Sequence, residues 1–176
     1  MKHDELILRL CEGNRRYQEK SDAALREETA LNGQYPHTIV IACSDSRVIP
    51  ERIFSADLGE LFVIRVAGNV LDRHQLGSIE YAAAHLGCKL IIMLGHTGCG
   101  AVGAALEGHA EGYIASITDD IRAAIGDEKD PYEACRLNVV CGVERIKREF
   151  ADNPEMAGAD VRGAIYDIES GGVKWL

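Results

Sequence analysis

Three short apolar runs lie between His37 and Gly95: HTIVIAC (37–43), LFVIRV (61–66) and KLIIMLG (89–95). Each run is rich in β-branched residues and is followed by a glycine or a polar turn, which is the pattern of a buried strand. Good helix formers separate the second run from the third at Ser78–Leu86, with Ser78 as the expected N-cap. Strands that alternate with helices predict an α/β protein with a mostly parallel central β-sheet flanked by helices.

The segments on either side of these runs extend the prediction to both ends of the chain. Apolar residues recur at helical spacing over residues 4–20, which predicts an N-terminal amphipathic helix. Pro131–Phe150 predicts another long helix, with proline at its start. Residues 161–168 and 173–176, joined by a turn, predict a fourth strand and a C-terminal antiparallel edge strand. Because no repeat or linker divides the chain, we expect a single domain over residues 1–176.

Composition excludes several classes of protein. The chain is 47% hydrophobic and 27% charged, as in ordinary globular proteins, and its net charge of -9 offers no basic stripe for nucleic acid. The longest apolar run is far too short to cross a membrane, and the N-terminus has no apolar core of a secretory signal. We therefore expect a cytoplasmic protein that binds neither nucleic acid nor membrane. In a reducing compartment, clustered cysteines point to metal binding or catalysis, and we expect the four cysteines without a nearby ligand partner to be packing residues.

Three residues at the ends of the predicted strands could bind a metal. His96 and Cys99 are two residues apart in GHTGCG, and Cys43 follows the first strand. The pair alone is a weak signal, because a core histidine beside a buried cysteine gives the same pattern. Soft and borderline ligands favour Zn2+, and the absence of a fourth comparable ligand favours an open, catalytic site with one zinc per chain.

Four motifs occur in order around these ligands. They are CSDSR (43–47), GN (68–69), GSIEY (77–81) and GHTGCG (95–100). With these motifs, the sequence from about Gln34 to Val102 closely resembles the β-class carbonic anhydrases, and the resemblance continues loosely through 164–176. It implies that Cys43, His96 and Cys99 hold zinc and that Asp45 and Arg47 form the catalytic dyad.

The resemblance also implies a substrate pocket and a partner subunit. The residues that match the family's pocket are Gln34, Phe62, Ala67, Tyr81 and Gly100. In the family the Gln, Phe and Tyr reach the site from the neighbouring subunit, so we expect a homodimer or a dimer of dimers. The segment between Gly108 and Pro131 is short for the family, and we interpret it as a trimmed surface segment.

The implied reaction is the reversible hydration of carbon dioxide to bicarbonate and a proton by zinc-bound hydroxide, which makes the protein a zinc lyase. Two thiolate ligands weaken zinc as a Lewis acid, so activity should rise toward alkaline pH. Val40 stands where family members with an inhibitory bicarbonate site carry Trp, so we expect an unswitched enzyme although Arg65 matches that site. The alternatives are a carbonyl sulfide or carbon disulfide hydrolase, a non-catalytic bicarbonate-sensing or zinc-dependent assembly module, and a Cys43 nucleophile with His96 as its base.

Overall fold

The computed structural model describes residues 3–108 and 110–176. Contacts divide the chain into two compact units, one that ends at Gln34 and one that spans Tyr35–Leu176. The units are described separately below as the N-terminal unit and the sheet unit. The single domain expected over residues 1–176 stays a prediction.

The N-terminal unit consists of two helices, α1 (His3–Lys20) and α2 (Ala23–Asn32). The first confirms the helix expected over residues 4–20. The second was not anticipated, although its ends carry ordinary signals: the Asp22 side chain accepts the Leu25 N–H, and Gly33 has a positive φ of 85°. Neither helix has a buried residue.

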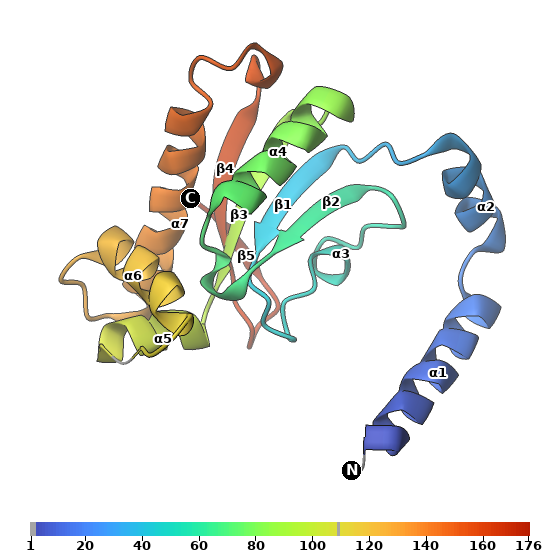
Figure 1. Ribbon diagram of the computed structural model, residues 1–176, viewed down its shortest axis with the longest axis horizontal. Helices are drawn as coiled ribbons and strands as arrows, with labels where there is room; N and C mark the ends of the chain where they lie inside the picture. Colours follow the sequence, from blue (N-terminus) through green and yellow to red (C-terminus); the bar gives the residue numbers. More distant parts are fainter. Residues whose placement is uncertain (1–2, 109) are drawn as a thin grey trace. The chain divides into compact units, whose positions relative to one another are not determined.

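The sheet unit is built on five strands in the order β2-β1-β3-β4-β5 (Figure 1). Their bounds are β1 (Thr38–Ala42), β2 (Leu61–Arg65), β3 (Leu90–His96), β4 (Asp160–Tyr166) and β5 (Val173–Trp175). The first four strands are parallel to their neighbours, and only β5 runs antiparallel, at the edge. These observations confirm the predicted fold class and the C-terminal edge strand.

Alternating side chains of the strands build two cores, one on each face of the sheet. On one face, Ile39, Ile41 and Met93 belong to the larger core. This core also includes residues of four helices: α4 (Arg73–His85), α5 (Gly100–Glu107), α6 (Ile114–Ile125) and α7 (Pro131–Glu149). On the other face, Val40 and Leu94 belong to a smaller core that includes residues near the short helix α3 (Pro50–Ile53). Because both faces are covered, every position of β1 is buried, as expected for a central parallel strand.

The helices of the larger core differ in part from the prediction. Helix α4 (Arg73–His85) begins well before Ser78, because Asp72 and Gln75 form a capping box. Ser78 lies inside the helix, where its hydroxyl donates to the His74 carbonyl. The interpretation of residues 108–131 as a trimmed surface segment was wrong in part, since α6 (Ile114–Ile125) buries Thr118, Ile121 and Ile125.

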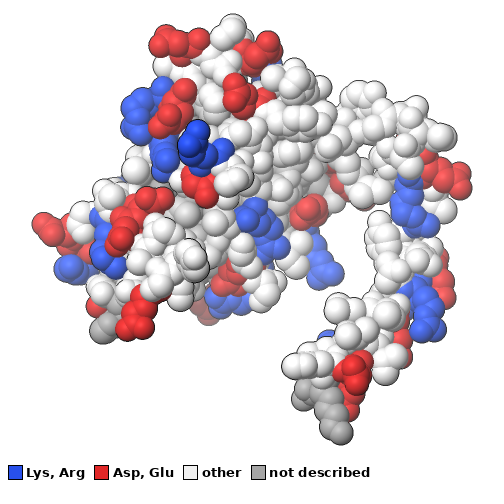
Figure 2. All heavy atoms as spheres, in the orientation of Figure 1, with Lys and Arg blue, Asp and Glu red and all other residues white. Residues whose placement is uncertain are grey.

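The remaining helices are α5 (Gly100–Glu107), α7 (Pro131–Glu149) and the 3-10 turns η1 (Ala67–Asn69) and η2 (Pro154–Met156). Helix α7 confirms the predicted long helix. Within residues 3–108 and 110–176, no helix is both long and apolar enough to cross a membrane. Figure 2 shows basic and acidic side chains interspersed over the visible face of the sheet unit.

Strand order places a switch point between β1 and β3. After β1 the chain passes to β2 on one side, and it then returns to β3 on the other side. The carboxyl ends of β1 and β3 lie side by side, and the loops that leave them turn in opposite directions, which opens the kind of crevice where α/β sheets bind ligands.

Candidate metal centre

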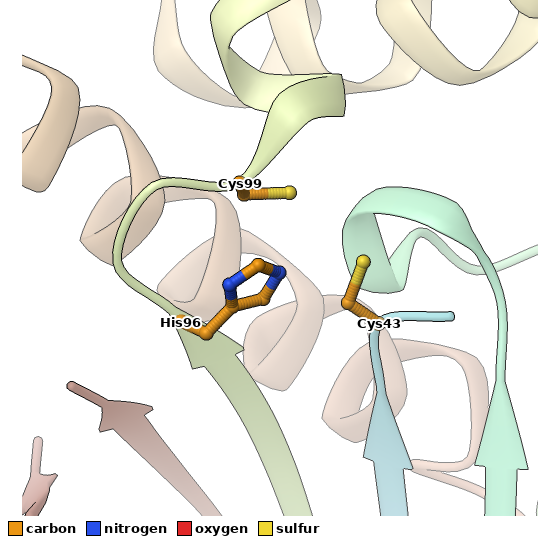
Figure 3. Close-up of side chains that lie close together, drawn as sticks. All are labelled: Cys43, His96 and Cys99. Carbon is orange, nitrogen blue, oxygen red and sulfur yellow. The ribbon is translucent and has the colours of Figure 1, made fainter. Parts of the chain in front are cut away.

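Three predicted ligands converge at the switch point. Cys43 directly follows β1, His96 is the last residue of β3, and Cys99 is the N-cap of α5. All three are buried, and one ligand atom from each lies within 4.8 Å of the others. Figure 3 shows the two sulfurs and the imidazole ring directed toward a common space. Among the residues that the structure describes, this trio is the one group of three or more such side chains found at metal-binding distance.

The imidazole of His96 is oriented for metal binding. Its Nδ1 lies 3.0 Å from the carbonyl oxygen of Thr97, so Nδ1 carries the proton and Nε2 keeps its lone pair. Nε2 is fully buried without a hydrogen-bond partner. A buried nitrogen without a partner costs free energy unless another group satisfies it. A zinc ion held by Nε2 and the two sulfurs would do so, and this donor set fits a tetrahedral site with one position left for water.

The two sulfurs differ in their surroundings. In the metal-free chain, the Cys99 thiol donates toward Cys43 and, with backbone N–H groups, lowers the pKa of Cys43, although burial opposes this. The same contact and burial raise the pKa of Cys99. For His96, burial lowers the pKa, but Cys43, the Thr97 carbonyl and Asp45 together raise it above its usual value. The two thiols therefore hold one proton between them more tightly than a free cysteine does, and a metal that binds both sulfurs must displace it.

Asp45 and Arg47 form a two-pronged ion pair beside the trio. Arg47 Nε donates to Asp45 Oδ1 at 2.9 Å, and its terminal nitrogen donates to Oδ2 at 2.7 Å. These bonds hold the pKa of Asp45 well below its usual range. Arg47 also donates to the Gly98 carbonyl at 3.3 Å, which connects the loop after β1 to the loop after β3. The pair is thus part of the site's framework and not an isolated surface contact.

Arg65, at the end of β2, holds the loop that carries Cys43. Its Nε donates to the Cys43 carbonyl at 3.0 Å, and a terminal nitrogen donates to the Asp45 carbonyl at 2.6 Å. Sequence reasoning matched Arg65 only to a second bicarbonate site. In the structure its guanidinium fixes the backbone on both sides of Ser44.

The predicted pocket residues fall into two groups. Ala67 and Gly100 lie next to the metal centre, in η1 and at the first position of α5. Phe62 pairs with Ile39, four residues before Cys43, which is roughly 13 Å away along the strand. Its ring lies 6.2 Å from that of Tyr81, so these two aromatic residues cluster away from the chain's own metal centre. Gln34 is exposed at the end of the N-terminal unit.

Sequence reasoning missed Asn138 and misjudged two cysteines. Asn138 is buried in α7 and donates to the Gly68 carbonyl next to the metal centre, but a lone Asn inside a helical pattern gives no signal of this contact. Cys88 and Cys135 are buried as expected, whereas Cys11 and Cys141 are exposed. The latter two lie on helices at positions that face solvent, so the packing role expected for them was wrong.

Known proteins share this sequence pattern and fold. A model of the carbonic anhydrase family matches residues 38–173. Carbonic anhydrase 2 of Mycobacterium tuberculosis is 39% identical over 181 residues, which cover 92% of this chain and 87% of that protein. A carbonic anhydrase of Mycolicibacterium smegmatis is 42% identical over 162 residues, which cover 85% of this chain and 79% of that protein.

Solved structures agree with the sequence relatives. The β-carbonic anhydrase CcaA superimposes with a TM-score of 0.83 at 26% identity, covering 98% of this chain and 92% of that one. A tetrameric β-carbonic anhydrase of Sordaria macrospora gives 0.76 at 28% identity, covering 99% and 95%. Sequence, fold and the convergent Cys-His-Cys trio therefore agree that the chain belongs to the β-class carbonic anhydrase family.

Proposed function

We propose that this chain hydrates carbon dioxide reversibly to bicarbonate and a proton, with one zinc ion held by Cys43, His96 and Cys99. The observation that carries the proposal is the buried, unpartnered Nε2 of His96 facing two sulfurs, in a chain of this family. When bound, zinc supplies a hydroxide near neutral pH by lowering the pKa of coordinated water.

Asp45 orients the attacking oxygen. Its side chain is 17% exposed and stays ionised because Arg47 depresses its pKa, so it accepts a hydrogen bond and donates none. Oδ1 already accepts both the backbone N–H and the Nε–H of Arg47, whereas Oδ2 accepts one bond from Arg47 and retains a lone pair. Asp45 thus accepts hydrogen from the nucleophile, and Arg47 keeps the carboxylate from turning toward the metal. This arrangement, together with Val40 in place of a Trp, supports the unswitched form of the enzyme.

Substrate binding requires two subunits in this proposal. Ala67 and the Gly100 N–H, at the start of α5, contact carbon dioxide and bicarbonate from within the chain. Phe62 and Tyr81 lie too far from their own metal centre to do so, and Tyr81 is 47% exposed. We therefore assign Gln34, Phe62 and Tyr81 to the partner's site in a homodimer. The tetrameric Sordaria macrospora enzyme is compatible with a dimer of such dimers.

A cytoplasmic location fits the six unpaired cysteines.

Stopped-flow hydration of carbon dioxide across pH tests the proposal. The parent should be active, with a rate that rises toward alkaline pH, and Asp45→Ala should lower the rate at every pH while retaining zinc. Sulfide release from carbonyl sulfide and carbon disulfide should be measured in parallel. A parent that contains zinc but acts only on those gases, or on no substrate, would overturn the assignment.

A further inference from the structure

Asn138 makes a long-range contact that the proposed reaction does not use. It lies in the middle of α7 and is 7% exposed. Its Nδ2 donates to the carbonyl oxygen of Gly68 at 2.9 Å, across 70 residues of sequence. A buried amide that lost this hydrogen bond would pay the free energy of its desolvation without compensation. The bond therefore holds both Asn138 and Gly68 in place.

The turn that receives this bond has an unusual backbone. Gly68 and Asn69 have positive φ values of 66° and 44° in succession. A Cβ at position 68 would lie 2.8 Å from Ile121 Cδ1 and 3.1 Å from Ala101 Cβ, so only glycine fits there. A positive φ is uncommon for a residue with a Cβ, so contacts with the surrounding structure help to hold Asn69 in this conformation.

The same turn contacts a metal ligand. On one side of its Cα, Gly68 offers its carbonyl to Asn138. On the other side, its N–H donates to Cys43 Sγ at 3.3 Å. The Cys43 sulfur accepts a second N–H, from Asp45, at 3.4 Å. A chain of contacts therefore runs from α7 through one glycine to the sulfur.

We propose that Asn138 is a positioning residue for the metal centre: by anchoring Gly68, it keeps the Gly68 N–H on the Cys43 sulfur and so sets the donor strength of that ligand. This inference rests on the proposed metal site. A hydrogen bond to a thiolate withdraws electron density from sulfur and orients its lone pairs. In a site with two thiolates, which together cancel the charge of zinc, such bonds keep the metal electron-poor enough to act as a Lewis acid.

The test compares Asn138→Leu, which keeps the size of the side chain and removes its donor, with Thr38→Val. Thr38 is also buried and loses a hydrogen bond, with His37, but it lies at the opposite end of β1 from the metal centre. Zinc affinity is measured by chelator competition, and the sulfur-to-metal charge-transfer band is measured in the Co2+-loaded proteins. We expect Asn138→Leu to weaken zinc binding by about 10-fold or more and to move the band to lower energy. Thr38→Val should change neither. Asn138→Leu with parental affinity and band position would overturn the proposal.

A second measurement needs no variant. In the 113Cd-loaded parent, the Gly68 amide proton should show a through-bond coupling to cadmium across the N–H···S contact, and its absence would also overturn the proposal. If Asn138→Leu does not fold, Asn138→Ser keeps a small polar side chain that cannot reach Gly68, and it should weaken or abolish this coupling. Persistence of the full coupling in Asn138→Ser would contradict the role of Asn138. A parent that binds Cd2+ and Co2+ but does not hydrate carbon dioxide would remove the proposed function and leave this inference standing. A parent that binds neither metal would remove both.

Discussion

In the N-terminal unit, Leu10 and Leu31 expose 73% and 84% of their surface, whereas in the sheet unit every residue of β1 is buried. The two units thus use apolar residues in opposite ways. The sheet unit encloses its own core and holds the three proposed metal ligands at the ends of its central strands. The two helices of the N-terminal unit contain no buried residue within the described chain. The proposed metal centre thus belongs to the sheet unit alone, whereas the exposed apolar residues of α1 and α2 are available for association.

Replacing one histidine in each unit by alanine should give the largest difference between the units, in both zinc content and hydration rate. His96→Ala removes the nitrogen ligand, so we expect zinc to be lost and carbon dioxide hydration to fall by more than about 100-fold. His3→Ala, on the exposed surface of α1, should leave both unchanged. Metal analysis and stopped-flow rates on the two variants check this. Full activity of His96→Ala would place the chemistry elsewhere in the chain.

Truncating one apolar side chain in each unit should have very different effects on the free energy of unfolding. Ile39 is fully buried in β1, and Ile39→Ala should lower the free energy of unfolding by about 2–5 kcal/mol. Leu31→Ala, on α2, should change the stability of the sheet unit by less than about 0.5 kcal/mol. Hydrogen exchange of the β3 amides in both variants gives the comparison. Equal effects would mean that the sheet unit depends on the N-terminal helices for its folding.

A substitution on the exposed apolar surface of the N-terminal unit should weaken self-association of the chain. If the proposed dimer covers the apolar side of α1, Leu10→Ser should weaken self-association on the order of 10-fold, since burying a leucine contributes about 1.5–3 kcal/mol. Glu12→Ser, on the same helix, is the matched control. Sedimentation velocity over a range of concentrations measures both. An unchanged dissociation constant for Leu10→Ser would place the dimer contact outside this part of α1.

Removing the ion pair between Asp45 and Arg47 should have the smallest effect on the free energy of unfolding. The effect should be present at neutral pH and disappear in acid. Because Arg47 lowers the pKa of Asp45 in the folded state, the stabilisation is complete above the unfolded pKa of about 3.9 and is lost as the pH falls below it. Arg47 is 55% exposed, so solvent screening keeps the contribution small. The free energies of unfolding of the metal-free parent and Asp45→Asn, measured with denaturant, should therefore draw together progressively as the pH falls below about 4. A difference that grows as the pH falls would contradict the sign of the shift.

The sequence predicted most of the sheet unit because its signals are local. Apolar runs located β1, β2 and β3, proline located the start of α7, and the motifs located the three side chains that converge at the ends of β1 and β3. It misplaced the start of α4, because the good helix formers after Ser78 drew attention away from the capping box of Asp72 and Gln75. It missed the contact between Asn138 and Gly68, because 70 residues separate the partners and neither one signals the other. The separation of Phe62 and Tyr81 from Cys43 likewise depends on strand register, which single runs do not specify.

X-ray absorption of the zinc-loaded protein at neutral pH tests the metal centre most directly. We predict one zinc per chain, with two sulfur neighbours at about 2.3 Å and one nitrogen and one oxygen neighbour at about 2.0–2.1 Å. Purified chain that retains no stoichiometric zinc, or a coordination shell that lacks two sulfurs, would contradict the assignment of Cys43, His96 and Cys99 as its ligands.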